Sequence, residues 1–555
     1  MISTFHGLET AKRGMYTQQS ALYVTGHNIA NANTPGYSRQ RVNFTQTEPY
    51  PPASLNRPQI PGQIGTGVKA GTIQRMRESF LDIQYRNEHN KLGYWESRAE
   101  ALSKMEDIMN EPSENGLSAV MGEFWQSLQD LSTYPENEGT RQVVLQRGQA
   151  VVDTFHYLHA SLDSIKNDFG NEIGVNLKEI NSLLKQIGDL NNQIGKVEPH
   201  GYLPNDLYDQ RDQLVDELSK HLNIKVVKTP SGGKPQDIAE GQYNIKLVGA
   251  DGEISLVTGS DYMQLGFTGN NGLSYDVPNA IKEITVFDSE GKTASTSISI
   301  VDSNSKVVFS PGKLRGLIES YGYETTNPDG TKSIKGVYPD MLDNLDRLAY
   351  TFANIFNDIH SKGFNLNGEQ GSKEFFKLAN GSTVDFTDKE KYKGAAKDIL
   401  LGDLKPSDIA ASTKATMDAN GNIVSVDAGD GKNAINLANI ASMILTNANQ
   451  KLEGLSNIDL TKLSAISNGT INSFYEGMIG RLGVDSLQAN RLSNNSLVLS
   501  QSVDEKRKSV SSVSLDEEMT NLIKFQHAYN AAARQITVID EMLDKIINGM
   551  GVVGR

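Results

Sequence analysis

Two histidines spaced three residues apart are the first candidates for metal chemistry in this sequence. His156 and His159, in the stretch HYLH, fall within a predicted helix, where this spacing places two ligands on one face. The chain has no cysteine and no H-E-x-x-H motif, so nothing completes a tetrahedral set around the pair. The pattern is more typical of surface or half-buried histidines, and we predict no metal and no other cofactor.

A second candidate has the composition of a calcium loop without its full spacing. Asp418, Asn420 and Asn422 match the first three ligand positions, but position twelve is Gly429, where a calcium loop has glutamate. The stretch SGGKP at 231–235 lacks the preceding glycine and the following Ser or Thr of a phosphate loop. No G-x-S-x-G motif or Ser/His/Asp arrangement stands out. We therefore assign no catalytic residue and expect a protein that is not an enzyme.

The most unusual local chemistry is the stretch NIANANTPGYSRQ at 28–40. Pro35 biases the residue before it away from the helical region, so a preceding helix must end there or earlier. Asn31 or Asn33 can take a left-handed capping conformation, and Gly36 allows a tight reversal before an extended strand. We predict that this corner contacts other copies in a repeated assembly through Asn28, Asn31, Asn33, Pro35, Gly36 and Tyr37. We therefore expect Tyr37→Ala to affect assembly more than the isolated chain.

The elements that position this corner are two helices at opposite ends of the chain. Residues 4–29 carry apolar residues every seven positions: Leu8, Met15, Leu22 and Ile29. Residues 515–550 repeat the pattern more strongly, and Ser514 with Glu517 has the spacing of a capping box. The seam of this last helix contains Leu515, Leu522, Phe525, Tyr529, Ile536 and Leu543. Because narrow-faced helices are marginal alone, we predict that the first helix pairs with the last and that both seams contact other copies.

The interior of the chain combines long helices with a β-rich stretch. Helical periodicity covers about 78–109, 139–195 and 339–360, and a further helix at about 470–508 leads into the last one. Periodic runs of this length are typical of rods. Residues 231–310 instead alternate β-branched residues with Gly, Asp and Asn turns, which is typical of an antiparallel β module. We expect its strands and turns to be self-contained and the module to be dispensable for assembly.

The predicted fold class is multi-domain α+β, with a terminal coiled coil of long helices and a helical rod domain that contains an inserted antiparallel β module. At 555 residues the chain is too long for a single core. We predict the divisions 1–60 for the first helix and an extended arm, 61–230, 311–360 and 441–514 for the rod, 231–310 for the β module, 361–440 for a small irregular or β insertion, and 515–555 for the last helix.

Charge and composition exclude several functional classes. The net charge of −14 argues against a general nucleic-acid binder, because phosphate binding needs a basic face. No run approaches the roughly 18 apolar residues of a membrane span, so we expect no membrane insertion. The start MISTFHGLETAKRGMYTQQS has no continuous apolar region of a secretory signal. The lack of cysteine agrees with a protein that works outside the cell and is exported by another route.

Two stretches at opposite ends resemble a known family. NIANANTPGYSRQRV resembles the N-terminal signature of the axial proteins of the bacterial flagellum, and SVSLDEEMTNLIKFQHAYNAAARQITVIDEMLDKII resembles their C-terminal signature. Rod, hook and hook-associated proteins share these signatures. LPNDLYDQRDQLVDELSKHLNI, GKLRGLIES and LDNLDRLAYTFANIFNDIHSKGFNLNG are similar to the hook-associated members, over roughly 1–375 and 470–555.

The resemblance implies a structural, non-enzymatic subunit of the flagellum that self-assembles into a ring at the junction between hook and filament. Its end helices would pair into an inner α-helical tube. It would be exported unfolded through the flagellar type III apparatus, without a cleaved signal peptide. Its final location would be the extracellular part of the flagellum. The implied partners are its own copies, hook protein, a second hook–filament junction protein, and a cytoplasmic export chaperone at the C-terminal helix.

Two alternatives remain open at this point. The chain could be a flagellar hook protein, although hook proteins are expected to be β-rich between their ends, and long central helices argue against this. It could also be an exported adhesin or hydrolase that carries the axial ends as an anchor. In that case the β insertion would need a pocket with convergent polar groups.

Overall fold

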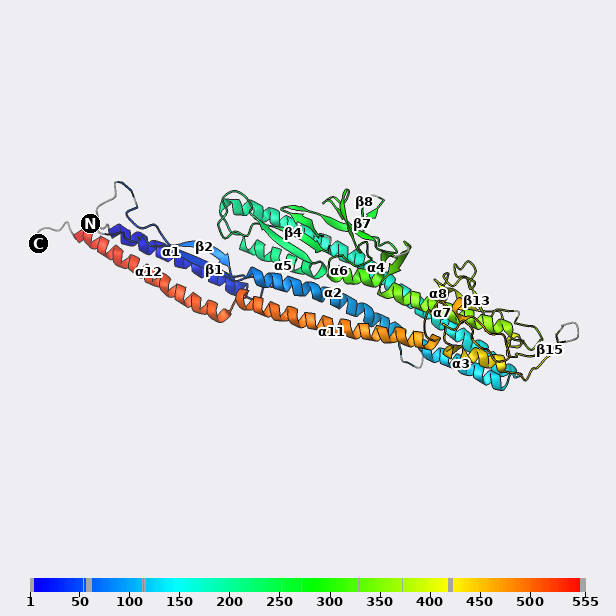
Figure 1. The fold of residues 1–555 in the computed structure, drawn as a ribbon. Helices are drawn as coiled ribbons and strands as arrows, with labels where there is room; N and C mark the ends of the chain where they lie inside the picture. The colour runs from blue at the N-terminus through cyan, green and yellow to red at the C-terminus, as the bar shows by residue number, and fades with distance from the viewer. Residues whose placement is uncertain are drawn as a thin grey trace.

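A computed structural model places most of the chain in one elongated molecule with both termini at the same end (Figure 1). At that end α1 (Thr4–Ala30) lies beside α12 (Leu515–Gly549), and in the next section α2 (Ser79–Met109) lies beside α11 (Ile471–Ser511). The chain therefore runs outward and back, as predicted. The structure describes residues 4–52, 54–55, 62–111, 113, 116–250, 252–270, 272–327, 330–371, 373–417 and 423–549.

The terminal unit contains a β hairpin in addition to the two end helices. β1 (Gln40–Gln46) pairs antiparallel with β2 (Val68–Arg75), with a bulge between Asn43 and Phe44. The hairpin packs on α1, where the Thr17 hydroxyl donates to the carbonyl of Val68 at 3.1 Å. The unit thus continues to the end of β2 and differs from the predicted division at residue 60, because β2 completes a hairpin whose first strand follows α1 directly.

The rod is a bundle of long helices with an aromatic core. Its longest helix, α4 (Glu138–Val197), has 60 residues and is capped by Asn137, whose side chain accepts from the backbone N–H groups of Gly139 and Thr140. The side chains of Phe124, Phe155, Phe352, Phe356 and Phe375 are fully buried and pack ring against ring. The helices of this bundle are α2, α3 (Leu117–Thr133), α4 (Glu138–Val197), α5 (Asn205–His221), α6 (Lys313–Tyr321), α7 (Val337–Lys362) and α11.

Two antiparallel four-stranded sheets form the β module on one flank of the rod (Figure 1). The first has the order β3-β4-β5-β6, from Ile224–Thr229, Gln242–Gly249, Gly252–Thr258 and Asp261–Tyr262. The second has the order β10-β9-β7-β8, from Ala294–Ser299, Glu283–Phe287, Gln264–Gly269 and Gly272–Ser274. The sheets therefore begin at Ile224, before the predicted start at 231, because β3 pairs with β4 along its full length.

The β module is not self-contained, which differs from the expectation that its strands and turns form a unit of their own. Asn181 of α4 donates to the carbonyl of Leu265 at 2.8 Å and accepts from its N–H at 2.7 Å. Asn191, also on α4, makes the same two-way contact with Tyr243, at 2.8 and 3.0 Å. Since both asparagines are buried, α4 and the sheets share one interior.

Short elements complete the rod, and those of the small insertion lie at its distal end. Asn357 of α7 holds the chain of the small insertion in place, since its side chain accepts from the N–H groups of Phe375 and Phe376 and donates to the carbonyl of Phe376. These elements are β11 (Tyr323–Thr326), β12 (Lys332–Lys335), β13 (Phe376–Leu378), α8 (Ala395–Asp398), β14 (Ile399–Leu401), β15 (Ala415–Met417), β16 (Ile423–Val426), α9 (Lys432–Ala438) and α10 (Leu460–Leu463), with 3-10 turns η1 (Glu198–His200), η2 (Pro406–Asp408) and η3 (Asn439–Ser442).

Candidate functional site

α1 and α12 pack against each other within one chain, and the buried side chains of α1 are Ala11, Thr17, Ala21, Val24, Thr25 and Asn28 rather than the predicted heptad residues. The two helices run antiparallel: Asn28 of α1 is bonded to Glu518, while Gly7 lies so close to Ile539 that a Cβ atom added to the glycine would be 3.4 Å from Cδ1 of the isoleucine. Ring contact between Phe44 and Phe525, with centroids 5.9 Å apart, adds β1 to the pair. The seam residues Leu8, Met15, Leu22, Ile29, Leu522, Phe525, Tyr529, Ile536 and Leu543 are all partly buried, and Leu515 is exposed.

Asn28 is the best-satisfied polar group of this unit and is only 1% exposed. Its amide N–H₂ donates to the carbonyl of Gln40 at 2.8 Å and to Glu518 at 3.1 Å. Its carbonyl oxygen accepts from the N–H of Gln40 at 3.0 Å and from the hydroxyl of Tyr37 at 2.8 Å. Two donors and two acceptors are thus all used inside the chain, so Asn28 joins α1, the corner, β1 and α12.

The rest of the 28–40 corner is divided between buried and exposed residues. The Tyr37 hydroxyl also lies 2.9 Å from Nδ1 of His27, and burial, followed by Asp206, raises the pKa of Tyr37 well above its usual value. Asn31 is partly buried and its amide donates to the carbonyl of His27 at 3.0 Å. Asn33, Pro35 and Gly36 are exposed.

The backbone of the corner follows the predicted reversal with one difference. α1 ends at Ala30, before Pro35, and Gly36 has a φ of 78°, which favours glycine. The expected left-handed cap at Asn31 or Asn33 is wrong, because the positive-φ residues other than glycine in the described ranges are Asn110 and Ser305. Asn31 instead bonds back into the last turn of the helix.

Arg39 connects the corner to the break between α11 and α12. Its guanidinium donates to Glu518 at 2.8 Å and to Glu517 at 2.7 Å, and its backbone N–H donates to the carbonyl of Ser511 at 2.8 Å. Ser514 accepts from the N–H of Glu517 at 3.5 Å, but the Glu517 carboxylate is held by Arg39. Only half of the predicted capping box therefore forms, because a tertiary ion pair competes for its glutamate.

A dense network of charges lies where the terminal unit meets the rod, and we call it the charged joint. At its centre Asp212 of α5 lies 3.0 Å from Arg75, 3.5 Å from Arg77 and 3.2 Å from Arg86. Burial alone would raise the pKa of Asp212, but Arg77, Arg75 and Arg86 hold it well below its usual value. The joint comprises Arg75, Arg77, Arg86, Arg211 and Arg507 with Asp82, Asp209, Asp212, Asp216 and Glu240.

The corner is bonded directly to this joint. The N–H of Ser38 donates to Asp209 at 2.9 Å, and the side chain of Gln40 donates to Asp206 at 2.9 Å. Arg507, near the end of α11, pairs with Asp216 of α5. None of these charges was predicted as a site, although the acidic residues recur every three or four positions along α5, which places them on one helix face.

Metal and membrane sites find no support in the described ranges. The Nε2 atom of His156 lies 2.7 Å from the carbonyl oxygen of Ile399, so this histidine is engaged within the fold. Within the described ranges, no cluster of three or more histidine, aspartate or glutamate side chains is suited to hold a metal ion. The calcium-like positions 418, 420 and 422 lie outside those ranges. Across the same ranges, no helix combines the length and apolar character needed to cross a membrane.

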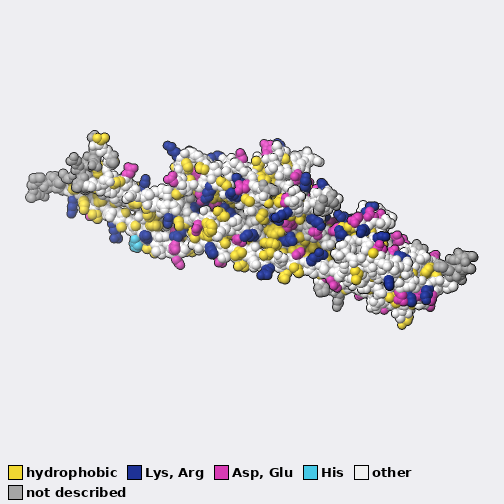
Figure 2. Space-filling model, in the orientation of Figure 1, with side chains coloured by type: hydrophobic (Ala, Val, Ile, Leu, Met, Phe, Trp, Pro, Cys, Tyr) yellow, Lys and Arg dark blue, Asp and Glu magenta, His cyan; other side chains and the backbone are white. Residues whose placement is uncertain are grey.

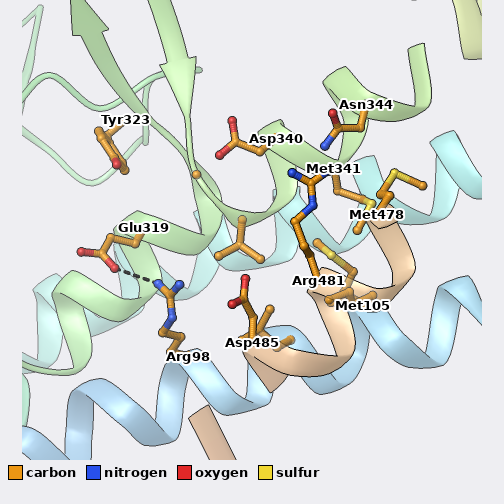
Figure 3. A pocket seen from close by; sticks show the side chains of 14 residues that line it. Arg98, Met105, Glu319, Tyr323, Asp340, Met341, Asn344, Met478, Arg481 and Asp485 are labelled. Carbon is orange, nitrogen blue, oxygen red and sulfur yellow. Dashed lines mark hydrogen bonds and ion pairs between the residues drawn. The ribbon is translucent and has the colours of Figure 1, made fainter. Parts of the chain in front are cut away.

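The rod has a cavity of about 340 Å³ between α2, α6, α7 and α11 (Figure 3). Its floor is formed by buried methionines, Met105, Met341 and Met478, and its rim carries the pair Arg98–Glu319, 3.0 Å apart. Asp340, Arg481 and Asp485 complete the rim, and neither histidine nor serine is among the lining residues. The cavity has no nucleophile–base pair and lies outside the β module, so it does not match the pocket that an anchored hydrolase would need.

Comparison with known proteins gives one match within the rod and the β module and two matches at the terminal helices. Residues 102–376 match the family described as flagellar hook-associated protein FlgK helical domain. Residues 509–549 match flagellar basal body rod FlgEFG protein C-terminal, and residues 8–37 match flagella basal body rod protein. The rod-protein families therefore match the segments that contain the terminal helices, and the hook-associated family matches most of the rod and the β module.

Relatives align over the full length. The chain is 42% identical to flagellar hook-associated protein 1 of Bacillus subtilis over 560 residues, covering 100% of both chains. It is 27% identical to the protein of that name from Salmonella typhimurium, over 97% of this chain and 98% of the relative. The solved flagellar hook junction protein FlgK from Burkholderia pseudomallei, 13% identical, shares the fold with a TM-score of 0.54, over 78% of this chain and 100% of that one. This chain belongs to the flagellar hook-associated protein 1 family.

Proposed function

We propose that the chain is a structural, non-enzymatic subunit of the bacterial flagellum that assembles with its own copies, outside the cell, at the junction between hook and filament. The observation that carries the proposal is the α1–α12 pair. The two helices cover one side of each other, yet the opposite side of each helix carries exposed apolar residues. An assembly subunit needs such open faces, whereas a self-sufficient domain would cover them.

The open sides of the pair carry large apolar residues. Phe5, Tyr16 and Tyr23 on α1 are 63%, 54% and 70% exposed. Met519, Ile523, Val538 and Met542 on α12 are 50–54% exposed. In Figure 2 hydrophobic side chains gather over the end of the molecule where the two helices lie. Scattered single residues would need no explanation, but this many exposed large apolar residues on one slender unit indicate surfaces that assembly covers.

The predicted interface residues keep a role in this proposal. Because the seam residues are only partly buried, neighbouring copies that pack on the pair would cover their remaining surface as well. Asn31, Asn33, Pro35 and Gly36 form the outer part of the corner, where a neighbour could reach them. Asn28 and Tyr37 would act indirectly, since their polar atoms already hold the corner in shape.

The relatives' names support partners on both sides of the junction. They are called hook-associated or hook junction proteins, and we infer that this chain contacts hook protein on one side and a second hook–filament junction protein on the other. Before export, the exposed apolar residues of α12 would favour aggregation, so a cytoplasmic export chaperone bound to that helix is a further proposed partner.

Deletion of the gene tests the proposal against the anchored enzyme. We expect non-swimming cells that still build hooks and still release flagellin into the medium, because the growing filament has no base. Re-expression of the chain should restore filaments, and electron microscopy with antibody labelling should place it between hook and filament. Cells that swim normally after deletion would overturn the proposal and favour an exported adhesin or hydrolase carried on axial ends.

A further inference from the structure

Four Asn–Gly pairs lie in the described part of the chain, and they differ in how their glycine is held. An asparagine that precedes glycine can react with its own backbone, because glycine has no Cβ atom to block the approach to its nitrogen. The reaction requires a local backbone that can move and a glycine N–H that is free of other bonds. The pairs are Asn367–Gly368, Asn380–Gly381, Asn468–Gly469 and Asn548–Gly549.

Two of these pairs are restrained by hydrogen bonds or by a helix. The N–H of Gly368 donates to the carbonyl of Asn365 at 2.9 Å, so this nitrogen is engaged in a turn. Asn548 lies in the last turn of α12, where backbone N–H groups point to the carbonyls of the preceding turn, and its side-chain amide donates to Asp544 at 2.7 Å. Each of these pairs must open locally before it can react.

The other two pairs are open at both reacting groups. Asn380 and Asn468 are exposed, and across the described ranges their side-chain amides have no hydrogen-bond partner. The N–H groups of Gly381 and Gly469 also donate to no acceptor in those ranges. Both glycines have a positive φ, 83° and 81°, which glycine adopts without strain. Water is therefore the only competitor for the reacting groups in this part of the structure.

We propose that Asn380 and Asn468 are sites of spontaneous chemical modification in the folded chain. The backbone nitrogen of the following glycine loses its proton to water and attacks Cγ of the asparagine. A new C–N bond forms, the bond from Cγ to the amide nitrogen breaks, and ammonia leaves as a five-membered succinimide ring closes. Water then opens the ring at either of its two carbonyls, which gives aspartate or isoaspartate. The reaction consumes only water and needs no enzyme or partner.

Conversion at Asn468 changes the start of α11. Thr470 caps this helix, since its hydroxyl accepts from the N–H of Ser473 at 3.1 Å and its N–H donates to the Ser473 hydroxyl at 2.8 Å. The carbonyl of Gly469 accepts from the N–H of Leu445 at 2.9 Å. Isoaspartate adds one atom to the backbone between residues 468 and 469, so it displaces this carbonyl and the cap that follows it. The first turn of α11 should therefore loosen as the chain ages.

Conversion at Asn380 has fewer consequences. This residue lies in a surface turn after β13, where the N–H of Ser382 donates to the carbonyl of Ala379 at 3.1 Å. A Cβ atom built on Gly381 would meet nothing within 4 Å, so the turn has room for an added backbone atom. Asn380 thus reports the reaction itself, whereas Asn468 also reports its effect on the rod.

Storage of the purified full-length chain at physiological temperature and mildly alkaline pH tests the reaction. Peptide mass spectrometry measures deamidation at each site, and labelling with an isoaspartyl methyltransferase detects isoaspartate. Asn380 and Asn468 should convert about fivefold or more faster than Asn367, whose glycine must first lose a hydrogen bond. In the urea-unfolded chain the three sites should convert at similar rates, since each precedes glycine. Equal rates in the folded chain would overturn the proposal.

The variant Asn468→Gln tests the effect on the rod, because glutamine keeps the amide but closes a ring far more slowly. In the aged unaltered chain, amides of residues 471–475 should exchange faster with deuterium than in the fresh chain. Aged Asn468→Gln should match the fresh chain, and aged Asn380→Gln, the matched control, should not. Unchanged exchange in a chain that carries isoaspartate at position 468, or equal loosening of aged Asn468→Gln, would refute this effect. The proposed function stands under either outcome, because the reaction requires no assembly.

Discussion

Asn28 and Glu518 lie 490 residues apart in the chain and are joined by a hydrogen bond of 3.1 Å in the interior of the terminal unit. The two residues are only 1% and 2% exposed. The other carboxylate oxygen of Glu518 accepts from Arg39 at 2.8 Å. The asparagine-rich corner therefore ties the first helix to the last inside one chain, in addition to any contact that it makes with other copies.

Asn28→Ala should destabilise the terminal unit of the isolated chain. The change leaves the buried N–H of Gln40 without its acceptor, and each buried polar group left without a partner costs about 1–3 kcal/mol. We expect faster amide hydrogen exchange in residues 28–46 and a lower melting temperature of this unit. Asn33→Ala, at an exposed position of the same corner, is the matched control. Equal effects of the two variants would contradict the role assigned to Asn28.

The observed contacts of Tyr37 also change the effect that we expect from its substitution. From the sequence, Tyr37→Ala should have little effect on the isolated chain and a large effect on assembly. The structure places its hydroxyl on Asn28 and His27, so the side chain belongs partly to the folded subunit. A local motif could specify the turn at Pro35 and Gly36, but the partners of Tyr37 depend on how the turn packs on α1.

Replacement of residues 231–310 by a short Gly/Ser linker should destabilise the rod rather than leave it intact. From the sequence the β module was expected to be dispensable, but Asn181 and Asn191 of α4 each bond to a strand of the module in both directions. Loss of the module would remove the partners of both buried amide N–H₂ groups, at about 1–3 kcal/mol for each unpaired group, although Asn191 would still accept from Arg211. Circular dichroism melting and soluble yield measure the effect.

A point variant gives the same test without a deletion. Asn191→Ala should lower the melting temperature of the rod, because it removes the contacts with Tyr243 and Gly259, whereas Asn192→Ala at the next, exposed position should not. A linker variant that is soluble, melts like the full chain and supports filament growth would show that α4 needs no cover from the sheets.

Long-helix periodicity was enough to predict most of the rod. The ranges 78–109, 139–195, 339–360 and 470–508 correspond to α2, α4, α7 and α11, because an apolar stripe at helical spacing is a local signal. The antiparallel class of the β module was also confirmed. Its first strand was missed because β3 follows the helix α5 after a short turn, and its pairing with β4 is not visible in its own residues.

The site could be predicted only in part. The pairing of the first helix with the last was predicted from their heptad patterns, but the exposed apolar residues on the other side of each helix were missed, because a heptad pattern singles out only one face of a helix. The charged joint was missed for another reason. Asp209, Asp212 and Asp216 resemble an ordinary solvated helix face until Arg75, Arg77 and Arg86 are brought to them by the fold.

The stability of the rod should fall as the pH decreases from about 6.5 to about 4. His360 is buried, its Nε2 atom accepts from the N–H of Ala410 at 3.1 Å, and burial lowers its pKa to about 4. The unfolded chain, with a histidine pKa near 6.5, therefore binds the proton first, so stability is complete above that pH and is lost on acidification. At about 1.4 kcal/mol per pKa unit, the loss from this group is roughly 3 kcal/mol.

Denaturant unfolding between pH 7 and pH 4 measures this loss. His360→Gln should flatten the pH dependence, although His221, whose pKa burial also lowers to about 4, should retain its own share. His527→Gln on the exposed surface of α12 should leave the slope unchanged. An unchanged slope for His360→Gln would mean that this histidine keeps the same proton affinity in the folded and unfolded chain.

The terminal helices should be less firmly ordered than the rod before assembly. α4 has 24 buried residues, whereas Glu518 is the one fully buried side chain in the described part of α12. Ordering the backbone of a residue costs about 1–2 kcal/mol, and a fully buried Leu or Phe recovers roughly 1.5–3 kcal/mol. Because every seam residue of α12 is only partly buried or exposed, the pair should open often in the free subunit.

We expect amides of residues 515–549 to exchange much faster than those of α4, and to become protected on assembly. Leu522→Asp with Ile536→Asp should leave the exchange of α4 unchanged and abolish incorporation into the junction. Protection of α12 equal to that of α4, in a subunit shown to be monomeric by sedimentation, would mean that the pair is stable without neighbours.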